Sequence, residues 1–180
     1  RCHGEWLELH DGFRAGPPLR RIALPCPIAD TVASDPAYRR LLHEWIADYS
    51  VDAIIVSSLI GHSLDVLGTG LPTARIVHDH YPLWPVLHRD FSDRSLRFDD
   101  HQRAADLATQ GPDREFSNTD SAHWKSIREA IVSQLLAASV QLVAPSQSAL
   151  ANDLHLAPEL SALRTAVIPH GLSAWPDGSP

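Results

Sequence analysis

The sequence predicts an α/β domain with a doubly wound, mostly parallel sheet. Short β-rich runs alternate with segments whose apolar residues recur at helical spacing, and this alternation implies parallel strands joined by right-handed crossovers. With 180 residues, of which 44% are hydrophobic, the chain is long enough for one well-packed core and too short for two ordinary domains. We therefore expect one domain over residues 1–172, followed over 173–180 by a linker rich in Pro, Gly and Ser.

The extended runs supply the strands of this sheet. Val51–Val56 is β-rich and almost uninterrupted, which predicts a strand buried on both faces. Thr73–Val77 leads into the most polar strand end of the chain, where Pro82 and Pro85 prevent the strand from continuing. The other expected strands are Trp6–Leu9, Arg21–Leu24, Val140–Ala144 and Thr165–Ile168.

Helix signals lie between these strands. Asp35 as N-cap and Pro36 in the first turn predict a helix over Pro36–Tyr49, which we expect to cover the sheet. Serine caps and apolar spacing predict further helices over Ser121–Ala138, after Ser146, and over about 61–68. Residues 92–118 show no periodicity, and their length indicates a functional or partly mobile loop.

Composition excludes several classes of partner. The formal net charge of −7 and a pI near 5.8 argue against nucleic-acid binding, which needs clustered Lys and Arg. Apolar runs are far shorter than the roughly 20 residues that span a bilayer, so we expect at most peripheral membrane association. Only Cys2 and Cys26 are present, which is neither a disulfide framework nor a metal-binding motif and favours a cytoplasmic protein.

The strongest candidate site follows the strand Thr73–Val77. Ligands of open α/β sheets bind beyond the carboxyl ends of the strands, where His78, Asp79 and His80 are expected. Residues two apart in an extended segment point the same way, so His78 and His80 would face one cleft and Asp79 the other side. The alternative is a strand end whose polar groups only hydrogen-bond the following loop.

A metal site is a second interpretation of the same residues. Two histidines separated by one residue at a strand end are ligands in zinc and iron hydrolases. His78 and His80 would need further ligands, for which His62, His88 and His170 are the candidates. No carboxylate or further histidine stands at ligand spacing, and barrel hydrolases of this kind need about 250 residues.

Two other strand ends carry polar residues. His62 begins a helical segment after a strand, where its imidazole would donate to a ligand oxygen or, alternatively, cap its own helix. Ser146 and Ser148 follow the strand Val140–Ala144 in the same manner, and for both of them helix capping is the stronger interpretation.

Four of these segments, in their order and separation, resemble the amino-terminal half of GT-B glycosyltransferases, and more narrowly the large retaining group called family 4. The resemblance covers about Arg21 to Leu172. The segments are Val-Asp-Ala-Ile-Ile-Val-Ser-Ser (51–58), Ile-Val-His-Asp-His-Tyr (76–81), Val-Ala-Pro-Ser-Gln-Ser (143–148) and Val-Ile-Pro-His-Gly-Leu (167–172).

The resemblance implies a Rossmann-like, acceptor-side domain followed by a carboxy-terminal domain that binds a nucleotide sugar. Such enzymes use no cofactor and transfer the sugar to a glycan or lipid-linked acceptor. The resemblance makes His78 the catalytic residue, because it matches a histidine that contacts the donor sugar. His62, Asp79, His80 and Ser146 become candidates for substrate binding.

The chain also departs from the family. The paired glutamates of the donor domain and the glycine-rich loop after the first strand are both missing, as expected of a fragment truncated at each end. Residues 169–171 match the entry to the interdomain linker, where the family more often has Asn than His170. We expect the fragment alone to be inactive or nearly so, and a non-catalytic α/β binding module stays open as an alternative.

Overall fold

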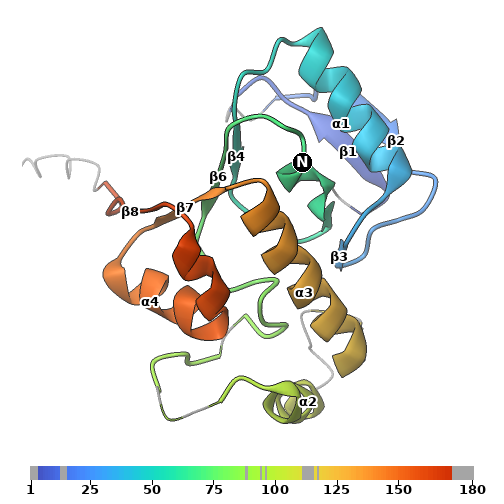
Figure 1. Cartoon of the computed structure of the whole chain (residues 1–180). Helices are drawn as coiled ribbons and strands as arrows, with labels where there is room; N and C mark the ends of the chain where they lie inside the picture. The colour runs from blue at the N-terminus through green and yellow to red at the C-terminus, as the bar shows by residue number, and fades with distance from the viewer. Residues whose placement is uncertain are drawn as a thin grey trace, which may run out of the picture.

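The computed structural model describes residues 4–12, 16–87, 89–93, 95, 97–110, 116 and 118–171. Its central feature is a four-stranded, fully parallel sheet in the order β4-β6-β7-β8 (Figure 1). The strands are β4 (Ile54–Val56), β6 (Thr73–Ile76), β7 (Gln141–Ala144) and β8 (Thr165–Val167). The expected α/β class is confirmed, and the arrangement is compatible with a Rossmann-like fold. A doubly wound sheet also needs a reversal of strand order, which these four strands do not contain.

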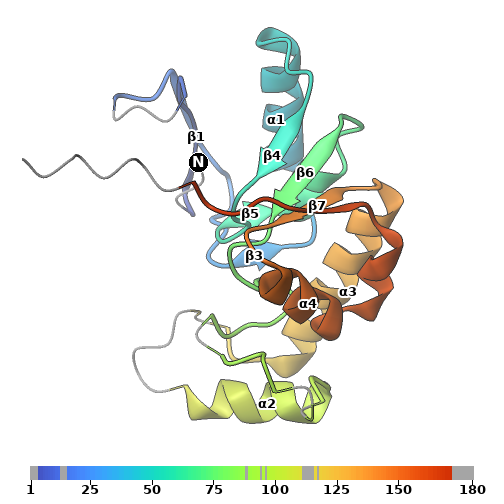
Figure 2. The same cartoon turned by 90° about the vertical axis from the view of Figure 1, so that its left-hand side faces the viewer.

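Two helices cover the same face of the sheet, α3 (Ser121–Ala137) and α4 (Gln147–Leu156). Leu142 and Ala144 lie two apart on β7 and so point to one face. Leu142 belongs to the apolar cluster that includes the buried residues of α3, and Ala144 packs in a cluster with Leu150 of α4. Figure 2 shows both helices on one side of the strands. Each later strand in the chain is added at the same edge of the sheet. Right-handed crossovers that all run in this direction place their helices on the same face.

The opposite face of the sheet is uncovered at Ile55 on its edge strand and half-buried at its other described positions. The Ile55 side chain on β4 is 74% exposed, whereas its neighbour Val56, which points the other way, is 5% exposed. The expectation that Val51–Val56 is a strand buried on both faces is therefore wrong. An unbroken apolar run is typical of a strand that is buried on both faces of its sheet. The run does not show whether a second layer of the protein covers the second face.

Adjacent threonine substitutions test this asymmetry. Ile55→Thr keeps a β-branched residue in an exposed position, so the free energy of unfolding should change by less than about 0.5 kcal/mol. Val56→Thr places a hydroxyl in the core and should cost roughly 1–3 kcal/mol. Urea unfolding of the two variants measures the difference, and equal costs would mean that a layer covers Ile55 in solution.

A second unit packs apart from the covered face. Strands β1 (Trp6–Leu9) and β2 (Arg20–Ala23) form an antiparallel hairpin, and α1 (Pro36–Asp48) buries its apolar side against it. The Asp35 cap is confirmed, because its carboxylate accepts a hydrogen bond from the Tyr38 amide at 2.7 Å. The expectation that this helix covers the sheet is wrong, because its apolar side packs against the hairpin and against Val66 of the segment Leu64–Leu67.

Two short elements replace the helix expected over 61–68. β5 (His62–Ser63) pairs in parallel with β3 (Thr31–Val32), and a 3-10 helix, η1, follows over Leu64–Leu67. The two leucines at its ends are buried, as the apolar spacing predicted. A second 3-10 helix, η2, spans Pro158–Ala162.

Helix α2 (Asp100–Thr109) was not predicted. Its buried residues are Arg103, Asp106 and Leu107, so two of the three are charged and no apolar periodicity marks the helix. The cap Asp99, which accepts from the Gln102 amide, was the available signal. The rest of the segment 92–118 includes residues outside the described ranges, and the expected linker over 173–180 also lies outside them.

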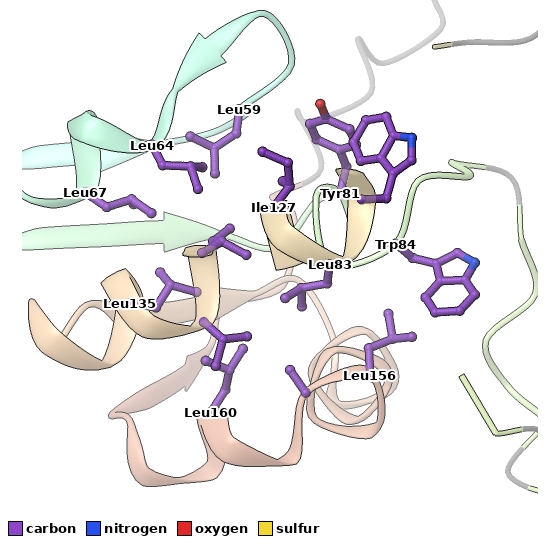
Figure 3. Packing of buried hydrophobic residues seen from close by; sticks show 14 of the residues in the cluster. Leu59, Leu64, Leu67, Tyr81, Leu83, Trp84, Ile127, Leu135, Leu156 and Leu160 are labelled. Carbon is purple, nitrogen blue, oxygen red and sulfur yellow. The ribbon is translucent and has the colours of Figure 1, made fainter. Parts of the chain in front are cut away.

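The segment after β6 is part of the main core. The side chains of Tyr81, Leu83 and Trp84 are 1–2% exposed and lie beside Ile127 of α3 and Leu156 of α4 (Figure 3). The residues that follow His80 are thus fixed by packing. In the described part of the chain, no helix is long and apolar enough to cross a bilayer.

Candidate functional site

The carboxyl ends of the parallel strands bring polar residues, among them the predicted His78 and Ser146, to one edge of the sheet. Ser57 and Ser58 follow β4, His78 follows β6, Ser146 follows β7 and His170 follows β8. The structure therefore gathers polar side chains from segments far apart in the sequence at a single edge.

A cleft of about 530 Å³ lies between the end of β1, helix α1 and the end of β4. Leu9, Ile55, Val56 and Val66 form its apolar walls. Its polar groups are two imidazoles, a carboxylate, a phenol and two hydroxyls, from His10, His62, Glu8, Tyr38, Ser57 and Ser58. Apolar walls with a few convergent polar groups are the usual composition of a small-ligand site.

His62 lies in this cleft and is held by α1. Its Nδ1 shares a hydrogen bond of 2.8 Å with the Tyr38 hydroxyl, and the two rings meet edge-on at 5.9 Å between centroids. The alternative in which His62 caps its own helix is wrong, because Ser63 is the N-cap of η1 and accepts from the Asp65 amide. The hydrogen bond and the ring contact with Tyr38 therefore fix the orientation of the His62 imidazole.

Glu8 and His10 form a second polar pair in the cleft, which the sequence did not predict. The Glu8 side chain is only 6% exposed, and its carboxylate lies 2.9 Å from Nε2 of His10 and 2.5 Å from Nε of Arg21. A carboxylate only accepts, so Nε2 of His10 carries the proton in this pair. The signal was a charged residue between Leu7 and Leu9 in a short strand.

His78 is the first exposed side chain beyond β6. It follows Val77, which is fully buried, and its amide donates to the Ile76 carbonyl at 3.2 Å as the chain turns away from the sheet. The His78 ring stacks on His170 with centroids 6.1 Å apart and an angle of 1° between the planes. His170 is thus the partner of His78 at the ends of β6 and β8.

His80 lies in different surroundings from His78. Its Nδ1 is 2.7 Å from the Asp153 carboxylate of α4, and its ring meets Phe91 edge-on at 4.5 Å. The side chain of His80 is 15% exposed. Asp79 accepts a hydrogen bond from the Tyr81 amide at 3.0 Å and lines a small hollow between the ends of β4 and β6.

Asp153 is the most deeply buried carboxylate of this region, with 0% exposure. Arg75, 3% exposed on β6, donates to it at 2.6 Å. Burial by itself would raise the pKa of Asp153, but the Arg75 guanidinium and His80 hold that pKa below its ordinary value. The carboxylate is therefore ionised at neutral pH. Burial raises the pKa of the neighbouring Tyr81, so its phenol stays protonated.

Ser146 caps α4. Its hydroxyl accepts a hydrogen bond from the Ala149 amide at 3.1 Å, which confirms the capping interpretation. The side chain is exposed at the end of β7, and its role in substrate binding stays a prediction.

The described residues contain no group of three or more His, Cys, Asp or Glu side chains that could hold a metal ion. Of the ligands considered for a metal site, His88 lies outside those residues. His80 already uses Nδ1 toward Asp153, and His62 uses Nδ1 toward Tyr38.

Comparisons of the chain with protein-family models, with curated proteins and with solved structures found no match.

Proposed function

We propose that this chain is the acceptor-side domain of a retaining glycosyltransferase that moves a sugar from a nucleotide-activated donor to a hydroxyl of a glycan or lipid-linked acceptor. The observation that carries the proposal is the cleft beside β4, lined by hydroxyl, imidazole and carboxylate groups at the carboxyl edge of a parallel sheet. These groups can both donate to and accept from a polyhydroxylated ligand. The doubly wound sheet of a GT-B domain is part of this proposal.

The roles of the residues follow from their positions. The polar cleft binds the acceptor and presents one hydroxyl, while His78 on the adjacent strand donates a hydrogen bond to the sugar that is transferred. The acceptor oxygen forms the new glycosidic bond as the bond between the anomeric carbon and the diphosphate breaks. The hydroxyl proton leaves with the diphosphate. Positioning and hydrogen bonding supply the rate enhancement, and a second domain binds the diphosphate.

The test begins with the complete gene product and a broad panel of nucleotide sugars and glycoside acceptors. We expect release of nucleoside diphosphate that depends on both substrates. In parallel, NMR of the 180-residue chain should show neutral glycosides shifting the signals of His62 and Tyr38. The matched reference is His43, which is exposed on α1 away from the cleft.

The outcomes separate the alternatives. Transfer without glycoside-induced shifts at the cleft would place the acceptor elsewhere and overturn the role of this cleft. Shifts at the cleft without consumption of any nucleotide sugar would instead favour a non-catalytic binding module. If neither transfer nor glycoside-induced shifts are observed, both the transferase function and the binding-module function are excluded.

A further inference from the structure

A single carboxylate contacts the segment 75–81 at its first residue, Arg75, and near its other end, at His80. Asp153 accepts a hydrogen bond from Arg75 Nη1 at 2.6 Å through Oδ2, and it contacts Nδ1 of His80 at 2.7 Å through Oδ1. Arg75 also donates from Nη2 to the Tyr81 carbonyl at 3.0 Å. We call the set Arg75, His80 and Asp153 the Asp153 clamp. His78 and Asp79 lie along the chain between Arg75 and His80, the two residues that Asp153 contacts.

A second attachment ties the same segment to the other half of the site. The buried Tyr81 hydroxyl donates to Oγ1 of Thr31 at 2.6 Å, and the Thr31 hydroxyl donates to the Leu59 carbonyl at 2.6 Å. Leu59 precedes His62 in the segment between β4 and β5. The loop that carries His78 is thus joined by buried hydrogen bonds to the loop that leads into β5, where His62 lies.

The chemistry of the clamp assigns the tautomer of His80. An ionised carboxylate only accepts hydrogen bonds, so Nδ1 of His80 carries the proton toward Asp153. Asp153 has both of its oxygens engaged and no exposure to solvent. These contacts fix the His80 ring from the side of α4, and the edge-on contact with Phe91 restricts it further.

We propose that His80 and Asp153 are positioning residues, which hold the segment 75–81 so that His78 is presented at the sheet edge. The inference rests on the proposed function. In it, His80 acts through its contact with Asp153 and does not bind the substrate directly. The last backbone hydrogen bond of this segment to the sheet is that of the Val77 amide to the Val143 carbonyl, at 2.8 Å, so beyond Val77 the side-chain contacts of the clamp help to supply the order that catalysis needs. A misplacement of about 1 Å can cost on the order of 10²-fold in rate.

The experiment compares two substitutions of His80 in the complete enzyme. His80→Phe keeps a ring that can pack on Phe91 but cannot donate to Asp153, and it should lower kcat by roughly 10- to 100-fold with little change in KM. His80→Asn retains an N–H near the position of Nδ1 and should recover most of that loss. His43→Phe is the matched control, because the same change on an exposed surface should leave kcat unaltered.

A second readout uses the 180-residue chain and does not depend on transfer. In ¹⁵N-detected NMR of histidine, His80 should be found with the proton on Nδ1. The His78 ring signal should broaden or shift in His80→Phe and return in His80→Asn. Thermal unfolding of each variant shows whether a change in rate reflects loss of folded protein.

Failure of the inference is distinguishable from failure of the proposed function. A wild-type enzyme that transfers no sugar would remove the proposed function, while the His78 signals would still test the clamp. Wild-type turnover and unchanged His78 signals in His80→Phe would overturn the positioning role while leaving the function intact. A rate loss that His80→Asn does not rescue would also overturn it and would favour direct contact between His80 and substrate.

Discussion

Replacement of His78 by Ala should lower glycosyl transfer by the complete enzyme roughly 10²-fold or more, in line with the loss of a hydrogen bond made to the transition state. Thermal unfolding should stay almost unchanged. His78 is exposed beyond the buried Val77, and its described ring contact is a stack on His170, itself exposed. Truncation therefore leaves no cavity and no buried polar partner, the two usual sources of large destabilisation.

Two measurements check this prediction, the rate of transfer and the midpoint of thermal unfolding, Tm. His43→Ala serves as the control because it removes an exposed imidazole from α1, away from the sheet edge. A His78→Ala variant that melted many degrees lower, with normal turnover by the remaining folded fraction, would show that His78 is structural.

Asp153→Asn should cause the largest loss of stability among the substitutions considered. The change preserves the shape of the side chain but leaves the guanidinium of Arg75, which is 3% exposed, without its anion. Removing one partner of a buried ion pair costs about 3–5 kcal/mol. For a domain of this size, that loss lowers Tm by roughly 6–20 °C.

Asp48→Asn is a close control for this experiment. Asp48 accepts from Arg20 at 2.8 Å, and the two side chains are 48% and 41% exposed. Solvent screens an exposed pair, so the same chemical change there should leave Tm almost unaltered. Equal shifts of Tm for the two variants would contradict the buried electrostatic role of Asp153.

The buried pair of Asp153 and Arg75 also predicts a pH dependence of stability. The folded pKa of Asp153 is lowered, so its contribution is full above the unfolded carboxyl pKa of about 3.9. The contribution is lost as the pH falls through the folded pKa. The difference in unfolding free energy between wild type and Asp153→Asn should therefore shrink on acidification below about pH 4. A pH-independent difference would disagree with this origin.

Much of the fold could be predicted because local signals and packing agree. The β1 strand has the predicted bounds, and the caps Asp35 and Ser146 fixed the starts of α1 and α4. Helix α2 was missed because its buried face contains Arg103 and Asp106, which an apolar pattern cannot detect. The partner of α1 was missed because an apolar helix face does not identify the surface that it will contact.

The candidate site was predictable only in part for a similar reason. The strand end located His78, since position along a parallel strand determines the edge at which a residue emerges. His62 lies in β5, which the sequence did not predict. The surroundings of His80 were not predictable, because Asp153 is 73 residues away in the sequence and its spacing carries no signal. The available signal, which was not used, was Arg75 inside a short apolar strand, because a buried guanidinium needs an anionic partner.

The exposed Ile55 has a consequence for how the chain behaves in solution. Ile55 is exposed on β4, which is an edge strand of the described sheet, and exposed apolar edge strands promote pairing between molecules. The net charge of −7 opposes such contacts through repulsion, but salt screens this repulsion beyond about 8 Å at physiological ionic strength. Concentrated solutions of the chain should therefore remain dispersed at low salt, and added salt should favour self-association through this face.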